Sequence, residues 1–261
     1  MTPRPVHHGI ATHLRQTGRA DGVPVLAVHG FAADMAVWML VEPALRETCA
    51  LTLVDLPGHG GSDPMLPEGG IDGFGAHLAA ILDTLGPRPH WLLAHSFGAA
   101  VALRAASLRP ERVAGLILLA PAGLSASVAP DFVRALCNAP DASAMRAILG
   151  RMLTRPAMIT PAMAQAVLAQ MQDPARGAAL RDVAALLPDF AAALAPHLPT
   201  LAHLPIHILR GTQDTIIDPT APLPDIWPNA RAHDIAGAGH LPQLEAAGHT
   251  LAVLKSALGI A

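Results

Sequence analysis

Short apolar runs alternate with longer helical patterns along most of this chain of 261 residues, and this alternation limits its fold more than any other feature. The runs are nearly continuous, as in strands that a parallel sheet buries on both faces. They occupy residues 23–28, 50–54, 90–94, 113–119, 206–209 and 231–235. Helical patterns follow at residues 72–85, 97–108 and 242–258. This order predicts a doubly wound α/β fold with a mainly parallel sheet of about eight strands.

The alternation stops between residues 123 and 199, where helical patterns are broken by prolines and no convincing strand occurs. These patterns cover residues 131–138, 143–154, 161–172 and 175–187. Residues 1–122 and 200–261 are therefore expected to form an α/β core, and residues 123–199 a helical cap inserted over the carboxyl edge of the sheet. Residues 10–15 are expected to add an antiparallel edge strand. Asp141 and Thr160 are plausible helix starts.

The composition predicts a folded, water-soluble domain. Hydrophobic residues make up 52% of the chain and charged residues 14%, which allows a large core. The formal net charge is only -3 and no basic stripe is present, so nucleic acid is not an expected partner. No apolar run is long enough to span a membrane. No His, Asp or Glu cluster has metal-ligand spacing, so we expect neither a metal nor an organic cofactor.

The cysteines and the first residues predict a cytoplasmic location. Cys49 and Cys137 are far apart and cannot form a disulfide framework, which fits a reducing compartment. Residues 1–8 lack the apolar segment of a secretory signal. The oligomeric state stays open.

A serine stands at the predicted junction of strand 90–94 and helix 97–108. The segment reads Ala94-His95-Ser96-Phe97-Gly98, which matches the nucleophile elbow G-x-S-x-G except that alanine replaces the first glycine. Small residues are needed on both sides because the turn is sharp and a larger side chain would strike the adjoining strand or helix. A serine that only caps the helix would give a similar pattern, so the elbow also needs catalytic partners.

Two candidate partners follow in the chain order that this arrangement requires. A serine hydroxyl becomes nucleophilic when a histidine takes its proton and an acid orients that histidine. Asp214 and His240 both stand where predicted strands end, at the edge that carries the sites of open α/β sheets. We therefore predict a Ser96-His240-Asp214 triad. Asp218 is the alternative acid, although an aspartate before Pro219 usually serves a turn.

The remaining site residues are predicted from their places beside this triad. The backbone N–H groups of Phe31 and Phe97 are expected to form the oxyanion hole. His29 more plausibly braces its loop than takes part in the chemistry. The expected apolar pocket residues are Trp38, Phe132, Leu136, Leu149, Met152 and Met163. The alternative role of these pocket candidates is core packing.

Together these motifs resemble the α/β-hydrolase superfamily over about residues 10–258. The resemblance is carried by Val28-His29-Gly30-Phe31, by Asp55-Leu56-Pro57-Gly58-His59-Gly60-Gly61-Ser62, by the elbow, and by the loops that end at Asp214 and His240. It implies the fold but not one reaction, because members include esterases, lipases, thioesterases, C–C bond hydrolases, haloperoxidases and lactonases. Dehalogenases and epoxide hydrolases carry an aspartate where Ser96 stands.

Residues 118–124 and the insertion up to Pro156 resemble the hydrolase-like domain of the acyltransferase component of acetoin dehydrogenase complexes. In that family a lipoyl domain precedes this domain, whereas only about nine residues precede the first strand here, so no lipoyl domain is expected. We predict a serine hydrolase that cleaves a small or medium uncharged carboxylic ester or related acyl substrate through an acyl-enzyme. An acyltransferase and a non-catalytic binding protein are the alternatives.

Overall fold

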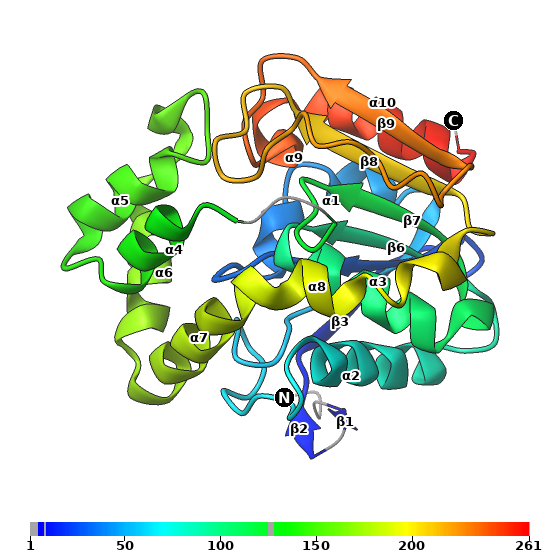
Figure 1. The fold of residues 1–261 in the computed structure, drawn as a ribbon, viewed down its shortest axis with the longest axis horizontal. Coiled ribbons are helices and arrows are strands. Elements are labelled where there is room, and N and C mark those ends of the chain that lie inside the picture. The colour runs from blue at the N-terminus through cyan, green and yellow to red at the C-terminus, as the bar shows by residue number, and fades with distance from the viewer. Residues whose placement is uncertain (1–4, 8, 125–127, 261) are drawn as a thin grey trace.

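The computed structural model describes residues 5–7, 9–124 and 128–260 (Figure 1). Within them a seven-stranded sheet has the order β3-β5-β4-β6-β7-β8-β9. All neighbouring strands are parallel except β3, which pairs antiparallel with β5. The strands of this sheet are β3 (Leu14–Gly18), β4 (Val23–Val28), β5 (Cys49–Val54), β6 (His90–His95), β7 (Val113–Leu119), β8 (Ile206–Gly211) and β9 (Ala230–Ile235). The predicted doubly wound fold is confirmed.

The edge strand is not where the sequence predicted it. Residues 10–15 were expected to join the sheet, but β2 (Ile10–Ala11) pairs instead with β1 (Val6–His7) in a separate hairpin. The antiparallel edge is β3, in register from Leu14 opposite Val54 to Gly18 opposite Ala50. Most of β3 is polar because an edge strand is partly exposed, so an apolar pattern does not mark it. The expected N-terminal features at residues 1–4 and 8 lie outside the described residues.

The apolar runs are explained by two separate cores, one on each face of the sheet. Leu92 of β6 packs in one core with α2 (Ile71–Thr84) and α3 (Phe97–Leu108). Its neighbour Leu93 packs in the other core with α1 (Glu42–Leu45) and α10 (Ala247–Leu258). Successive side chains of a strand point to opposite faces, so burial of both faces requires apolar residues at every position.

One predicted helix needs a small correction, and one short helix was not predicted. The pattern at 242–258 is divided into α9 (Pro242–Glu245) and α10, because Ala246 leaves the helical conformation with φ -130° and ψ 46°. Residues 35–38, which the sequence left unassigned, form the short 3-10 helix η1 (Met35–Trp38). Asp34 caps η1 by accepting a hydrogen bond from the Ala36 N–H.

The helical insertion consists of two parts. A lobe beside the sheet holds α4 (Pro130–Cys137), α5 (Ala142–Gly150), α6 (Pro161–Gln172) and α7 (Pro174–Leu186) (Figure 1). The next helix, α8 (Phe190–Leu194), returns to contact α2 and α3. Its Phe190 ring stacks on the Phe97 ring at 5.6 Å between centroids. The end of the predicted insertion therefore packs on the core. Residues 125–127 lie outside the described part.

Helix starts in the insertion follow the local sequence. Asp141 and Thr160 were predicted as starts, and their side chains accept hydrogen bonds from the N–H groups of Ala144 and Met163. Asp173 caps α7 in the same way. The described residues contain no helix that is both long enough and apolar enough to cross a bilayer.

Candidate active site

Ser96 occupies a strained turn between β6 and α3, with φ 51° and ψ -117°. Its hydroxyl makes no capping hydrogen bond to α3, so helix capping does not explain it. A Cβ atom on Gly98 would lie 2.2 Å from the carbonyl oxygen of His29. This close approach requires glycine and holds α3 tightly against the neighbouring strand end. The backbone strain is of the kind that persists at functional sites.

The three predicted triad residues meet in one buried cluster. The Nε2 atom of His240 lies 3.0 Å from Ser96 Oγ, and its Nδ1 atom lies 2.8 Å from Asp214 Oδ2. The residues are only 6%, 2% and 9% exposed in the order Ser96, His240 and Asp214. With an ionised Asp214, the imidazole proton stays on Nδ1, which leaves the Nε2 lone pair free to accept the serine proton.

Asp214 is held in its ionised form. Burial raises its pKa, but attraction to His240, the hydrogen bond from His240 and two backbone amides lower that pKa by more. The amides are those of Ile216 and Ile217, which donate to Oδ1 at 2.8 Å and 3.1 Å. The net result is a pKa below the ordinary value of an aspartate. One carboxylate oxygen is thus fixed by the backbone, and the other faces His240.

Asp218, the alternative acid, lies on the surface and serves a turn. Its Oδ1 atom accepts hydrogen bonds from the Thr220 N–H at 2.8 Å and the Thr220 hydroxyl at 2.7 Å. Asp218 makes no described contact with His240, so the geometry favours Asp214 as the acid.

The loop that carries Phe31 passes close to Ser96. A Cβ atom on Gly30 would lie 3.2 Å from Ser96 Cβ and 2.6 Å from His95 Nδ1, so only glycine fits there. Phe31 and Phe97 line the same cavity as Ser96. Neither of their N–H groups takes part in a hydrogen bond among the described residues. Both amides are therefore available to a developing oxyanion.

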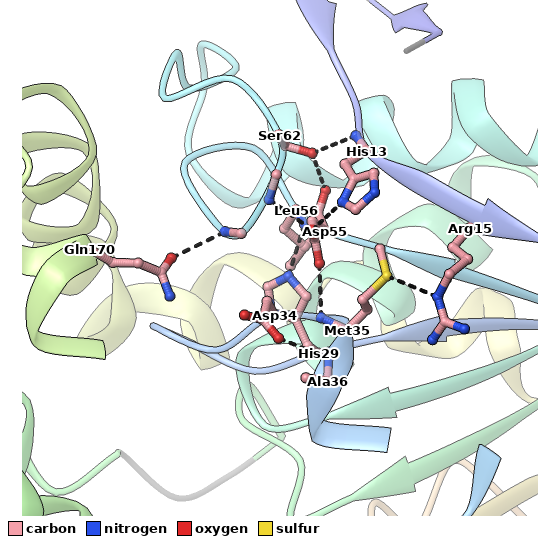
Figure 2. A network of polar contacts seen from close by, with 12 residues as sticks. His13, Arg15, His29, Asp34, Met35, Ala36, Asp55, Leu56, Ser62 and Gln170 are labelled. Atoms are coloured by element: carbon pink, nitrogen blue, oxygen red, sulfur yellow. Dashed lines mark hydrogen bonds and ion pairs between the residues drawn. The ribbon is translucent and has the colours of Figure 1, made fainter. Parts of the chain in front are cut away.

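Asp55 organises the loops behind this site (Figure 2). Its carboxylate accepts hydrogen bonds from the Met35 N–H at 2.8 Å, the Gly61 N–H at 2.8 Å and His13 Nδ1 at 2.7 Å. The sequence showed Asp55 only as part of a motif and did not predict this role. The signal was an aspartate at a strand end followed by a glycine-rich turn, a pattern that suits a carboxylate binding backbone amides.

His29 braces the loop that carries Phe31, as the sequence suggested. The Leu56 N–H donates to His29 Nε2 at 2.9 Å, so the proton lies on Nδ1, which donates to the Gly30 carbonyl at 2.7 Å. Figure 2 shows His29 between the Asp55 turn and η1. Burial lowers the pKa of His29, which keeps the ring neutral in this role.

A cavity of about 260 Å³ opens beside Ser96 and His240. Five of the six predicted pocket residues line it, namely Phe132, Leu136, Leu149, Met152 and Met163. Sequence reasoning missed several other apolar residues of its wall, including Val37, Met39, Val133, Val167 and Ile216. Some of these lie on the same helix faces as the predicted residues, so helical spacing would have found them.

Trp38 does not line this cavity, contrary to prediction. It is 1% exposed and packs with Val41 and Leu45 in the core on the face of α1 and α10. The turn of η1 explains this placement, because it directs Val37 and Met39 into the cavity and Trp38 into the core.

The polar groups of the cavity beyond the triad are few. Among the described residues that line it, Asp34 is the one acidic or basic side chain besides the histidines, and Gln170 adds an amide whose oxygen accepts from the Gly60 N–H at 3.1 Å. In the described ranges no group of three or more His, Cys, Asp or Glu side chains could hold a metal ion. The arrangement places a serine that is hydrogen-bonded to a buried histidine beside an apolar cavity.

A family model described as the alpha/beta hydrolase fold matches residues 23–247. The dihydrolipoyllysine-residue acetyltransferase component of the acetoin cleaving system of Pseudomonas putida is 32% identical to the chain over 232 residues. This match covers 89% of the chain but 62% of the relative, so the chain spans less than two thirds of that protein. Lipase LipV of Mycobacterium tuberculosis is 37% identical over 133 residues, which are 51% of this chain and 50% of the lipase.

Solved structures share this fold over nearly the whole chain. A serine hydrolase from the polyaromatic hydrocarbon-degrading bacterium Cycloclasticus zankles matches with a TM-score of 0.85 and 19% identity. The match covers 98% of this chain and 96% of that chain. At this level of identity the likeness establishes the architecture, and function must be argued from the site.

Proposed function

Because this chain belongs to the α/β-hydrolase fold family, we propose that it is a serine hydrolase of small or medium uncharged carboxylic esters or related acyl compounds. The observation that carries the proposal is the buried contact of His240 with both Ser96, at 3.0 Å, and Asp214, at 2.8 Å. Relatives named as lipases and esterases act on bonds of this class, which supports the proposal.

The proposed reaction proceeds in two steps. Ser96 Oγ attacks the carbonyl carbon while its proton passes to His240 Nε2, and the carbonyl electrons move to oxygen. The Phe31 and Phe97 N–H groups stabilise that oxyanion. The intermediate then expels the alcohol, which takes the proton from His240 Nε2. In the second step water gives a proton to His240, attacks the acyl-enzyme and releases the acid, and Ser96 regains its proton.

The cavity supports an uncharged substrate. Its wall is mostly apolar, and in the described part of that wall Asp34 is the one carboxylic side chain and no lysine or arginine occurs. A substrate carboxylate or phosphate would lose its hydration without meeting a lysine or arginine of the wall. Neutral acyl chains would instead gain about 25 cal/mol for each Å² of apolar surface buried.

A panel of neutral esters, thioesters and lactones, with monoesters of dicarboxylic acids as charged counterparts, tests the proposal. We expect turnover of the neutral compounds, low activity on the charged ones, and labelling of Ser96 by a fluorophosphonate probe. Absence of both turnover and labelling would support a binding protein on a hydrolase fold instead.

A second candidate is acyl transfer to a thiol or alcohol. It is favoured by the similarity to the acetyltransferase component of the acetoin cleaving system, which extends over 89% of this chain. Product analysis separates the two reactions. A hydrolase forms the free acid at a rate that an added thiol does not change, whereas a transferase forms the new ester or thioester in proportion to the acceptor.

We also propose that the protein acts in the cytoplasm. Cys49 and Cys137 are free thiols, the first buried and the second half-buried. Burial raises the pKa of both, which disfavours reactive thiolates. Fractionation of cells that express the protein tests this location, and recovery outside the cytoplasmic fraction would contradict it.

The pH profile should show one ionisation on its acid side. The base must be neutral to take the serine proton, so its protonation on the acid side stops the reaction. The neighbouring His59 and His95 have their pKa lowered to about 3, first by burial, so they stay neutral. Asp214, with its lowered pKa, stays ionised. We therefore expect one group, the base, to control the acid limb, where log(kcat/KM) should fall with a slope of about one. A flat profile from about pH 5 to 9 would contradict a histidine base.

Shortening the cap wall should change the preference for acyl chain length. Met152→Ala or Phe132→Ala adds space to the cavity, and a methylene in an apolar pocket typically discriminates by about 1–3 kcal/mol. We expect the ratio of kcat/KM between long and short esters to change about tenfold or more. Met145→Ala is the matched control, since Met145 is a fully buried cap residue that does not line the cavity. It should lower the melting temperature and leave the ratio unchanged, and an equal ratio in all three variants would refute a pocket role.

A further inference from the structure

Glu245 of α9 binds the cap and the His240 loop with one buried carboxylate. Its Oε1 atom accepts hydrogen bonds from the Thr154 N–H at 2.8 Å, the Thr154 hydroxyl at 2.7 Å and the Arg155 N–H at 3.1 Å. Its Oε2 atom accepts from the Gly239 N–H at 2.6 Å. The side chain therefore joins the turn after α5 to the residue that precedes His240.

The same cap turn also holds His240 directly. The His240 N–H donates to the Met152 carbonyl at 2.7 Å. A Cβ atom on Gly239 would lie 2.5 Å from that carbonyl oxygen and 3.2 Å from Glu245 Oε2, so glycine is required for this approach. The backbone of the His240 loop is thus in close contact with the cap turn at Met152.

The other backbone group of His240 is held from the elbow. His95 Nε2 donates to the His240 carbonyl at 2.9 Å, and the two rings meet edge to face at 4.9 Å between centroids. Burial lowers the pKa of His95 to about 3, so it has one ring proton, which this bond uses. His240 is therefore held through its N–H by the cap and through its carbonyl by the residue before Ser96.

Burying the carboxylate of Glu245 costs free energy that its hydrogen bonds must offset. Glu245 is 8% exposed, and removing an ionised group from water carries a large penalty that charge-assisted hydrogen bonds must offset. The donors that offset it come from two segments that are far apart in sequence, around residues 154 and 239. The second segment directly precedes His240, and the first follows Met152, whose carbonyl accepts from the His240 N–H.

We propose that Glu245 is a positioning residue that fixes the catalytic base through the cap, so that the cap holds His240 against Ser96 in addition to lining the pocket. The inference rests on the proposed function, because it assigns His240 as the base. Displacement of a reacting group by about 1 Å can reduce a rate about 10²-fold, so a modest loosening of this loop should be measurable.

Glu245→Gln tests the proposal with little change in volume. The amide oxygen can still accept from the Thr154 side, but the amide nitrogen then faces the Gly239 N–H, and that hydrogen bond is lost. We expect kcat to fall about 10-fold to 100-fold with KM changed less than about threefold. The rate of Ser96 labelling by a fluorophosphonate should fall in parallel, and hydrogen exchange at the His240 N–H should become faster.

Glu42→Gln is the matched control. Glu42 is also 8% exposed, and its carboxylate pairs with Arg15 at 2.6 Å, away from His240. This variant should lose stability while keeping kcat and the exchange rate at His240. If Glu245→Gln, assayed while folded, keeps wild-type kcat and His240 exchange, the positioning role is refuted.

Thr154→Val provides a second test if Glu245→Gln does not fold. It removes the contacts of the hydroxyl with Glu245 Oε1 and with the Gly237 carbonyl and leaves the Gly239 bond in place, so kcat should fall severalfold and His240 exchange should rise. Unchanged values in this variant would overturn the proposal. Hydrogen exchange also separates the two hypotheses. If the wild-type protein shows neither turnover nor labelling, the serine hydrolase proposal is rejected. Exchange at the His240 N–H that is slow in the wild type and faster in Glu245→Gln would still show that Glu245 holds the His240 loop.

Discussion

Replacement of Ser96 by alanine should abolish turnover and leave the protein folded. The change removes the atom that forms the acyl-enzyme, and only binding and the oxyanion hole remain. In a serine protease triad the corresponding loss is about 10⁶-fold in kcat, and we expect a loss of this order here. Steady-state kinetics and fluorophosphonate labelling of the variant measure it.

The fold should tolerate this change because serine and alanine share the Cβ atom that the strained turn must accommodate. The Ser96 backbone has φ 51°, and its N–H donates to the Leu119 carbonyl at 2.9 Å, a backbone bond that the substitution does not remove. The hydroxyl bonds to His240, whose Nε2 atom faces the cavity. The melting temperature should therefore stay close to that of the wild type. More than a few per cent residual activity, with contamination excluded, would disprove the nucleophile assignment.

The contact of His240 with Ser96 and Asp214 was predictable because each of the three residues stands in a local pattern. Ser96 lies between a continuous apolar run and a helical pattern, and small residues flank it. Asp214 and His240 follow later apolar runs, and parallel strands bring their carboxyl ends to one edge of the sheet. The chain order of the three residues and the topology of the sheet together determine which side chains meet. The prediction therefore needs no separate knowledge of long-range contacts.

Features that depend on tertiary contacts were not predictable in this way. β3 is polar because one side of an edge strand stays exposed, so the apolar pattern placed the edge too early in the chain. Trp38 was expected in the pocket but lies in the core. Its side depends on the turn of η1, a short helix that no pattern in the sequence predicted.

The roles of Asp55 and Glu245 illustrate the same limit. Both carboxylates bind backbone N–H groups, which every residue except proline carries, so their partners leave no mark in the sequence. Glu245 and Thr154 are 91 positions apart. The sequence predicted a cap above the site, but only the structure shows that the cap turn contacts the His240 loop.

Asp214→Asn should reduce kcat on the order of 10⁴-fold, by analogy with the same change in a protease triad. The local hydrogen bonds explain why. Asp214 Oδ1 accepts from the N–H groups of Ile216 and Ile217, so the asparagine oxygen should take that side. The NH₂ group then faces His240 Nδ1, where the wild type has a carboxylate oxygen at 2.8 Å. His240 Nδ1 would become the acceptor and Nε2 would carry the proton, which is the tautomer that cannot accept a proton from Ser96.

The matched control is Asp218→Asn. Asp218 is an exposed turn residue whose described hydrogen bonds go to Thr220, and an asparagine oxygen can accept them equally well. Its kcat should therefore stay within about twofold of the wild type, whereas Asp214→Asn should keep its fold and lose activity at every pH. Kinetics of the two variants on one ester, with melting temperatures measured in parallel, decide the assignment. If Asp218→Asn proved the more damaging change, Asp214 would not be the acid of the triad, and the hydrogen bond between Asp214 and His240 would need another explanation.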